Sequence, residues 1–121
     1  MKRLLFTLAT CCVMCACEQK TEINPFFTEF QTEYGAPDFT KIRLEHYEPA
    51  FLKGIEEQNA EIKAIVDNPE EPTFENTIVA LDKSGGILAR VSGVFFALTE
   101  ADTNDSLTAL NEKIGSCTFR T

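Results

Sequence analysis

The sequence predicts an all-α protein, in which a helical hairpin is followed by the start of a third helix. Three stretches carry apolar residues at the three- to four-residue spacing of one helix face. Pro69 and Pro72 separate the first stretch from the second, and residues that favour helix N-termini precede the second and third stretches. These observations place the helices within residues 49–66, 73–98 and 104–114.

The first helix is predicted to run from near Pro49 to about Val66. Proline suits a first-turn position because the N–H that it lacks would have no partner there. Glutamates and a lysine lie opposite the apolar face of this helix. The apolar face consists of Phe51, Ile55, Ile62, Ile65 and Val66.

The second helix is predicted to begin at Thr73, a good N-cap, with Glu75 near the positive end of the helix dipole. Gly85 and Gly86 interrupt its apolar stripe, so either the helix bends there or a neighbour packs close. Residues 87–98 are apolar on nearly every side, which predicts burial all round. The stripe consists of Phe74, Ile78, Leu81, Leu88, Val91, Phe95 and Leu98.

The third helix is predicted to begin near Asn104 or Asp105, both good caps. Residues 115–121 then end its apolar pattern without a polar finish, which predicts an aberrant tail there. Its apolar face consists of Leu107, Leu110 and Ile114. Two helices and a stub cannot cover an all-round apolar helix, which suggests a fragment of a larger helical protein.

Residues 18–45 are predicted to be irregular, because Pro25 and Pro37 punctuate them and residues 34–37 favour a turn. The segment is too rich in aromatic residues for a disordered linker. We therefore expect it to lie across a larger surface and to bury rings there. Its aromatic residues are Phe26, Phe27, Phe30, Tyr34 and Phe39.

Four of the five cysteines crowd into residues 11–17. Cys12 and Cys15 have C-x-x-C spacing, but a structural zinc site needs a second pair, and only Cys117 and His46 remain to supply one. A disulfide framework is disfavoured because cysteines this close would enclose very small loops. The cluster therefore suggests neither a metal site nor a disulfide cluster.

A lipoprotein signal peptide accounts for the cluster better. Lys2 and Arg3 form a positive start, and the uncharged run that follows is shorter than the ~20 apolar residues of a spanning helix. Residues 14–17 (MCAC) resemble a bacterial lipobox, which predicts removal of residues 1–16 and a lipid attached to Cys17. Residues 17–23 would form a solvated tether. The predicted location is an exported, membrane-anchored lipoprotein that faces the periplasm or the cell exterior.

The net charge of −8 narrows the classes of partner. Loss of Lys2 and Arg3 with the signal would leave 105 residues and a charge of −10. A surface this acidic argues against nucleic acid and against attraction to anionic lipid. Membrane association is therefore expected through the lipid anchor alone.

Four short patterns resemble functional sites but lack the partners that those sites need. His46 is the only histidine, and a structural role near a helix start is favoured over a ligand or general base. Residues 102–105 suggest calcium, but Lys113 stands where the bidentate glutamate belongs, so helix capping explains them better. Residues 84–86 lack the lysine of a phosphate loop, and residues 92–93 lack the strand of a nucleophile elbow. The sequence assigns no catalytic and no metal-binding residue.

Several motifs nevertheless fall in the order found in a known peptidase family. They are NPFF at 24–27, LEHYEPAF at 44–51 and NPEEPTFENTIVAL at 68–81, followed by Ser84-Gly85, Arg90-Val91, Val94-Phe95-Phe96 and Thr103-Asn104-Asp105. Residues 24–114 thus resemble the N-terminal region of the thimet oligopeptidase family of zinc metallopeptidases, most closely its peptidyl-dipeptidase (dipeptidyl carboxypeptidase) branch. The pattern ends after Ile114, so the resemblance implies a truncated chain.

The resemblance implies a large helical enzyme that binds short peptides and releases C-terminal dipeptides. Its N-terminal helices would form part of a channel wall, and its zinc would lie on an H-E-x-x-H helix with a further glutamate. A single histidine cannot supply that motif, so no catalytic or metal residue carries over, and no cofactor is expected in this chain. The expected partner is the missing catalytic part of the same protein.

A second hypothesis is a small, self-sufficient helical lipoprotein that binds a partner through its helical face. Finding H-E-x-x-H just downstream in another reading frame of the coding sequence would decide for the first hypothesis, whereas the second requires that residues 17–121 unfold cooperatively.

Overall fold

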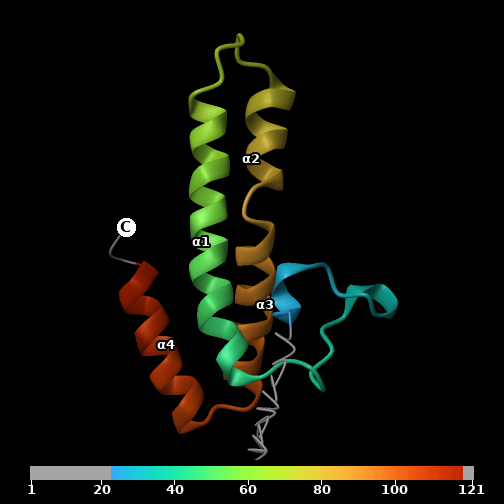
Figure 1. Cartoon of the computed structure of the whole chain (residues 1–121), viewed down its shortest axis with the longest axis vertical. Helices are drawn as coiled ribbons and strands as arrows, with labels where there is room; N and C mark the ends of the chain where they lie inside the picture. The colour runs from blue at the N-terminus through green and yellow to red at the C-terminus, as the bar shows by residue number, and fades with distance from the viewer. Residues whose placement is uncertain (1–22, 119–121) are drawn as a thin grey trace, which may run out of the picture.

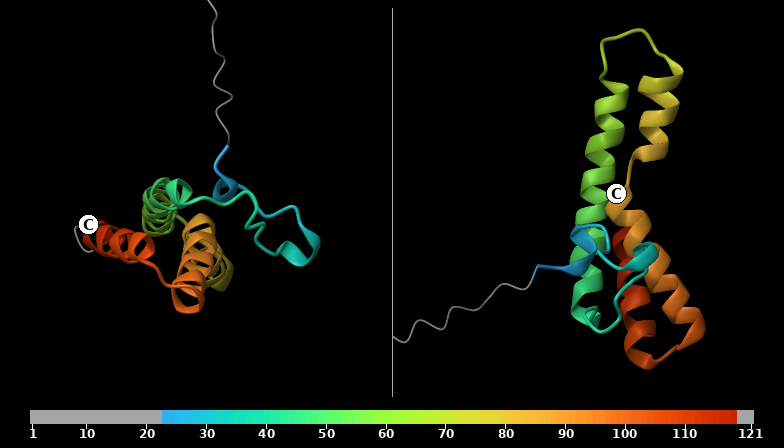
Figure 2. Two further views of the ribbon diagram at one scale, coloured as in Figure 1. Left: turned by 90° about the horizontal axis from the view of Figure 1, so that it is seen from below. Right: turned by 90° about the vertical axis from the view of Figure 1, so that its right-hand side faces the viewer.

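The structure, a computed structural model, describes residues 23–118, and these are helical without β-strands, which confirms the all-α prediction. Figure 1 shows α1 side by side with the chain that returns through α2 and α3, while α4 lies along another side of α1. Residues 23–43, the arm, are non-helical chain and short turns that lie on one side of the hairpin, near the end where α1 begins (Figure 2). The elements are the 3₁₀ turns Pro25–Phe27 and Glu33–Gly35, α1 (Leu44–Val66), a π-helical segment (Phe74–Val79), α2 (Ala80–Lys83), α3 (Gly86–Ala101) and α4 (Asp105–Thr118).

Helix α1 begins at Leu44, five residues before the predicted start at Pro49. The His46 ring makes this possible, because its Nδ1 accepts a hydrogen bond from the Arg43 backbone N–H at 3.1 Å and caps the first turn. Pro49 therefore lies inside the helix, where it removes one backbone hydrogen bond. Burial of Tyr47 and Phe51 on the same turns offsets that loss.

The second helical segment begins at Thr73, as predicted. The Thr73 hydroxyl accepts from the Asn76 N–H at 3.0 Å, and the Asn76 side-chain oxygen accepts from the Thr73 N–H at 2.7 Å. These reciprocal bonds satisfy two backbone donors that the first turn would otherwise leave unpaired. They show why the helical region starts at this residue.

Both alternatives for the glycine pair are correct at Gly85. Its φ of 73° is in the left-handed region that favours glycine, and it breaks the chain between α2 and α3. A Cβ on Gly85 would also lie 2.7 Å from the side-chain nitrogen of Gln58 on α1. The Gly85 N–H donates to the Glu61 carboxylate at 2.7 Å, so the bend is tied to α1.

The closest approach of α1 to α3 is at Gly54. A Cβ at this position would lie 2.8 Å from the Leu88 backbone nitrogen and 2.9 Å from its Cα. Only a residue without a Cβ lets the two backbones pack at this separation. Gly54 does not stand out in the sequence, because helical spacing does not show which residue faces a crossing helix.

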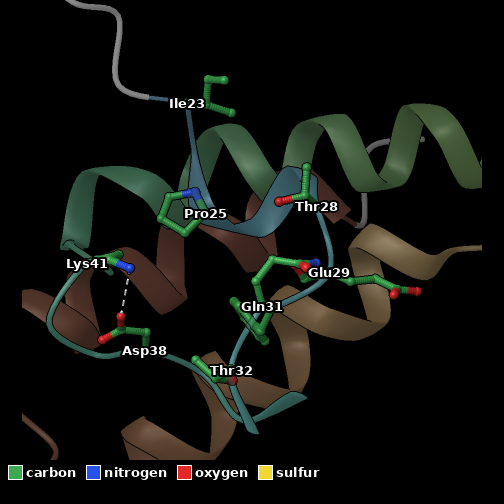
Figure 3. A pocket seen from close by; sticks show the side chains of 9 residues that line it. Ile23, Pro25, Thr28, Glu29, Gln31, Thr32, Asp38 and Lys41 are labelled. Carbon is green, nitrogen blue, oxygen red and sulfur yellow. Dashed lines mark hydrogen bonds and ion pairs between the residues drawn. The ribbon is translucent and has the colours of Figure 1, made fainter. Parts of the chain in front are cut away.

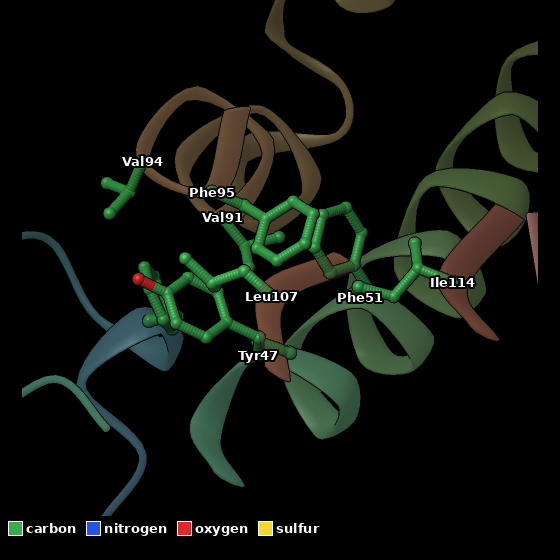
Figure 4. Close-up of a cluster of buried hydrophobic side chains, with 9 residues drawn as sticks. Tyr47, Phe51, Val91, Val94, Phe95, Leu107 and Ile114 are labelled. Carbon is green, nitrogen blue, oxygen red and sulfur yellow. The ribbon is translucent and has the colours of Figure 1, made fainter. Parts of the chain in front are cut away.

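The core is a cluster of aromatic rings between α1, α3 and the arm (Figure 4). The Phe95 ring centroid lies 5.2 Å from that of Tyr47 and 5.5 Å from that of Phe51. Phe26 of the arm lies 5.2 Å from Tyr47 and is fully buried. Leu107 and Ile114 of α4 close the cluster, which confirms the apolar face predicted for that helix.

The expectation that the arm buries its rings holds for only some of them. Phe26 is buried, and Phe27 and Phe30 pack against the core in part. Tyr34 and Phe39 were predicted wrongly, since 96% and 54% of their surfaces are exposed. Tyr34 occupies the predicted turn, where its φ of 62° lies in the left-handed region.

Helix α4 begins where the caps predicted it, with the Asn104 side chain accepting from the Leu107 N–H at 3.0 Å. Its end was predicted wrongly, because the helix continues past Ile114 to Thr118. Gly115 does not stop it, since glycine inside a helix costs only about 1 kcal/mol relative to alanine. The end of the apolar spacing at Ile114 therefore does not mark the end of the helix.

Within residues 23–118, two apolar surfaces are exposed: the side of residues 87–98 that faces away from α1, and the half of the hairpin that contains α2, which we call its far half. Residues 87–98 are buried on the side that faces α1, but Phe96 on the opposite side is 50% exposed. In the far half of the hairpin, the C-terminal half of α1 and the returning chain pack only against each other. Large apolar side chains there therefore remain uncovered. They are Ile62, Val66, Phe74, Ile78 and Leu81.

Candidate functional site

The polar residues that the sequence analysis weighed as candidates are engaged in local structure where the structure describes them. His46 is 8% exposed and its Nδ1 is engaged by the Arg43 N–H, which supports the structural role. Asn104 is engaged as a helix cap. No three histidine, cysteine or acidic side chains within residues 23–118 are grouped to hold a metal ion. Cys17 lies outside the described residues.

The buried phenol of Tyr47 is the main titratable group of the core. Its hydroxyl has no hydrogen-bond partner among the described residues, and burial raises its pKa above the ordinary value of 10.0. It lines neither the arm pocket nor the groove described next. Tyr47 packs its ring against those of Phe26 and Phe95 in the core.

A polar pocket of about 280 Å³ lies within the arm (Figure 3). Lys41 Nζ lies 3.1 Å from Asp38 Oδ2, and the Thr40 hydroxyl donates to Asp38 Oδ1 at 2.6 Å. The Thr40 hydrogen bond and then the one from Lys41 hold the pKa of Asp38 below its ordinary 3.8. The side chains of Asp38, Thr40 and Lys41 satisfy one another, so they stabilise the approach to α1.

A larger and more apolar groove of about 560 Å³ lies between the arm and α3. Its floor is the outer face of α3, and its wall is the stretch of arm that ends at Phe39. Arg90 of α3 fixes the wall to the floor, because its Nη1 donates to the Phe26 carbonyl oxygen at 2.8 Å. The lining residues are Glu29, Phe30, Gly35, Pro37, Phe39, Ala89, Arg90, Gly93, Val94 and Ala97.

The floor of the groove is low because its residues are small. Ala89, Gly93 and Ala97 recur every four residues, so they lie on one face of α3, and all three are exposed. A Cβ on Gly93 would meet no atom within 4 Å. A helix or a bulky apolar side chain can therefore approach the backbone of α3 closely here.

This groove was not predicted from the sequence, although one of its features is visible there. The four-residue spacing of small residues in α3 is visible in the sequence. The wall could not be foreseen, because Phe30 and Phe39 reach α3 only through the path that the arm takes. Chemically, the groove offers apolar contact and charges at its edge, and no reactive group.

No helix within residues 23–118 is both long and apolar enough to cross a membrane.

The comparisons with known proteins point to peptidases. No protein-family model matches the chain. Dipeptidyl carboxypeptidase of Escherichia coli (strain K12) is 48% identical over 96 residues, which are 79% of this chain and 14% of that protein. Dipeptidyl carboxypeptidase of Salmonella typhimurium (strain LT2) is 47% identical over 89 residues, 74% of this chain and 13% of that protein. The chain thus spans about one seventh of the length of these relatives. Over about three quarters of its own length, the chain is related in sequence to dipeptidyl carboxypeptidases.

Proposed function

We propose that this chain is the N-terminal helical part of an exported zinc peptidase that releases C-terminal dipeptides from short peptides. The observation that carries the proposal is the 48% identity over 96 residues to a dipeptidyl carboxypeptidase. In this proposal the chain supplies helices of the wall around the substrate channel, and the rest of the protein supplies the chemistry.

The distribution of apolar surface supports a wall. Phe74 and Ile78 are 65% and 51% exposed on the far half of the hairpin, and Phe96 is 50% exposed on α3. Exposed apolar surface on two sides of one small helical unit is typical of a layer inside a larger assembly. A wall built from such a layer would be covered on these sides by further helices.

The residues of this chain do not fit the zinc centre of such an enzyme. A catalytic zinc usually has three protein ligands, and the H-E-x-x-H motif alone needs two histidines. The whole sequence has one, His46, and its Nδ1 is engaged in capping α1. We therefore assign the metal to another part of the proposed protein.

The chain alone is expected to hydrolyse no peptide, with or without added zinc, because its single histidine cannot supply H-E-x-x-H and no group of metal-ligating side chains lies within residues 23–118. The measurement is release of C-terminal dipeptides from a short N-terminally blocked peptide, with a chelator control. Chelator-sensitive release by the purified chain would contradict the assignment of the chemistry to another part.

A chimera tests whether this chain can supply the N-terminal helices of an active peptidase. The segment of the Escherichia coli enzyme that matches this chain, 14% of that protein, is replaced by the corresponding residues of this chain. The chimera should release C-terminal dipeptides, while the same enzyme with the segment deleted should not. An inactive chimera, or a deletion variant as active as the chimera, would refute the proposal.

The lipid anchor remains part of the proposal and rests on residues 1–17 alone. Lys2, Arg3 and the Ala16-Cys17 pair favour cleavage before Cys17 and its acylation. Each buried CH₂ of an acyl chain contributes about 0.8 kcal/mol, so two or more chains anchor a protein firmly. Mass spectrometry of the membrane fraction should find acylated Cys17 as the first residue, whereas an intact Met1 in soluble protein would exclude the anchor.

A further inference from the structure

Resting on the proposed function, we propose that the groove between the arm and α3 receives an apolar helix from the remainder of the peptidase. A basic residue of that helix would pair with Glu29 at the edge of the groove. This assigns an interaction surface and the chemistry of its occupant within the same protein.

The shape of the groove is built before any partner arrives. The Arg90–Phe26 hydrogen bond of 2.8 Å joins residues 64 positions apart and holds the arm against α3. Phe26 is itself anchored in the core, with its ring 5.2 Å from that of Tyr47. A preformed groove binds a helix at a lower entropic cost than a flexible one.

The floor indicates a helix as the occupant. Ala89, Gly93 and Ala97 give α3 a flat strip one residue wide, beside the aromatic wall of Phe30 and Phe39. Small residues at four-residue spacing allow two helix backbones to approach closely, with the larger side chains of the partner filling the groove. The 560 Å³ of open space accommodates several such side chains.

Charge and chain length indicate where that helix comes from. About six sevenths of the related peptidases lie outside the matched segment, so most of the surface that could cover α3 belongs to that remainder. A second copy of this chain is disfavoured, because each copy has a net charge of −8 and Glu29 lies at the edge of the groove. The Glu29 carboxylate has no ion-pair partner within residues 23–118, so a cation on the incoming helix would complement it.

Gly93 provides the test, because alanine and leucine have similar helix propensities and differ mainly in how far they fill the groove. In the chimera, Gly93→Ala should leave dipeptide release close to that of the unmodified chimera and should not speed thermal inactivation. Gly93→Leu should speed thermal inactivation about tenfold or more, because the added side chain displaces the docked helix. In the chain alone, where a Cβ on Gly93 would meet no atom within 4 Å and the groove is open, the two variants should have similar thermal midpoints.

Glu29→Gln tests the charge of the occupant. At low salt, this variant should inactivate about two- to threefold faster than the unmodified chimera, and the difference should vanish in 1 M salt. No difference at low salt would overturn the basic residue assigned to the helix.

The outcomes separate this inference from the proposed function. An active chimera in which Gly93→Leu and Gly93→Ala behave alike overturns the groove and leaves the proposed function intact. An unmodified chimera without activity overturns both. Light scattering of the full chain adds a further measurement. A dimer that Gly93→Leu disrupts and Gly93→Ala does not would assign the groove to a second copy instead.

Discussion

Replacing Phe95 with alanine should lower the free energy of unfolding by about 3–5 kcal/mol. Phe95 is fully buried, and its ring lies against those of Tyr47 and Phe51, at centroid distances of 5.2 and 5.5 Å. The substitution leaves a cavity where three elements meet, so the walls cannot collapse without moving α1 or α4. Thermal unfolding of residues 17–121, followed by circular dichroism at 222 nm, measures the change.

The next residue provides the matched control. Phe96 is 50% exposed, so Phe96→Ala removes the same atoms from a site that is already half in water. Its cost should be below about 1 kcal/mol, in the range of surface substitutions plus a partial loss of contact. Equal losses at the two positions would contradict the core assigned to α1, α3 and α4.

Gly54→Ala should also destabilise the protein, by about 1–3 kcal/mol, although alanine favours helices. The new Cβ would lie 2.8 Å from a backbone nitrogen of α3, and a backbone atom cannot rotate away as a side-chain end can. The helices must therefore separate, which loosens the ring cluster next to the contact. Urea unfolding of the same residues gives the free-energy difference.

Gly93→Ala is the control for this prediction, because it makes the same chemical change in the middle of a helix. Nothing lies within 4 Å of a Cβ there, so the gain in helix propensity should raise stability by up to about 1 kcal/mol. The two substitutions should thus have opposite signs. A stabilising Gly54→Ala would show that α1 and α3 do not cross as closely as described.

The chain has a closed core and open faces, and this combination bears on how it works. The aromatic cluster joins α1, α3, α4 and the arm, so these elements can hold their arrangement. The groove on α3 and the far half of the hairpin remain uncovered. The proposed function and the groove inference follow from this contrast, since a wall segment needs both internal order and surfaces for its neighbours.

The sequence by itself determined the features that depend on residues a few positions apart. The caps at Thr73 and Asn104 were predicted correctly because each bonds an N–H three residues ahead. The all-α class and the buried face of α4 followed from helical spacing in the same way. The break at Gly85 was visible too, since a left-handed residue commonly needs glycine.

Only the tertiary structure decided the features that depend on distant residues. His46 is fixed at the start of α1 partly by Asn24, whose side-chain nitrogen donates to the His46 carbonyl oxygen at 2.7 Å across 22 positions, and the helix starts before Pro49. Phe26 and Phe39 are the same residue type in one arm, yet one is buried and the other is 54% exposed. The close approach at Gly54 and the wall of the groove likewise depend on which surfaces meet. Spacing along a chain identifies an apolar face, whereas its partner is set by contacts between segments that the spacing does not relate.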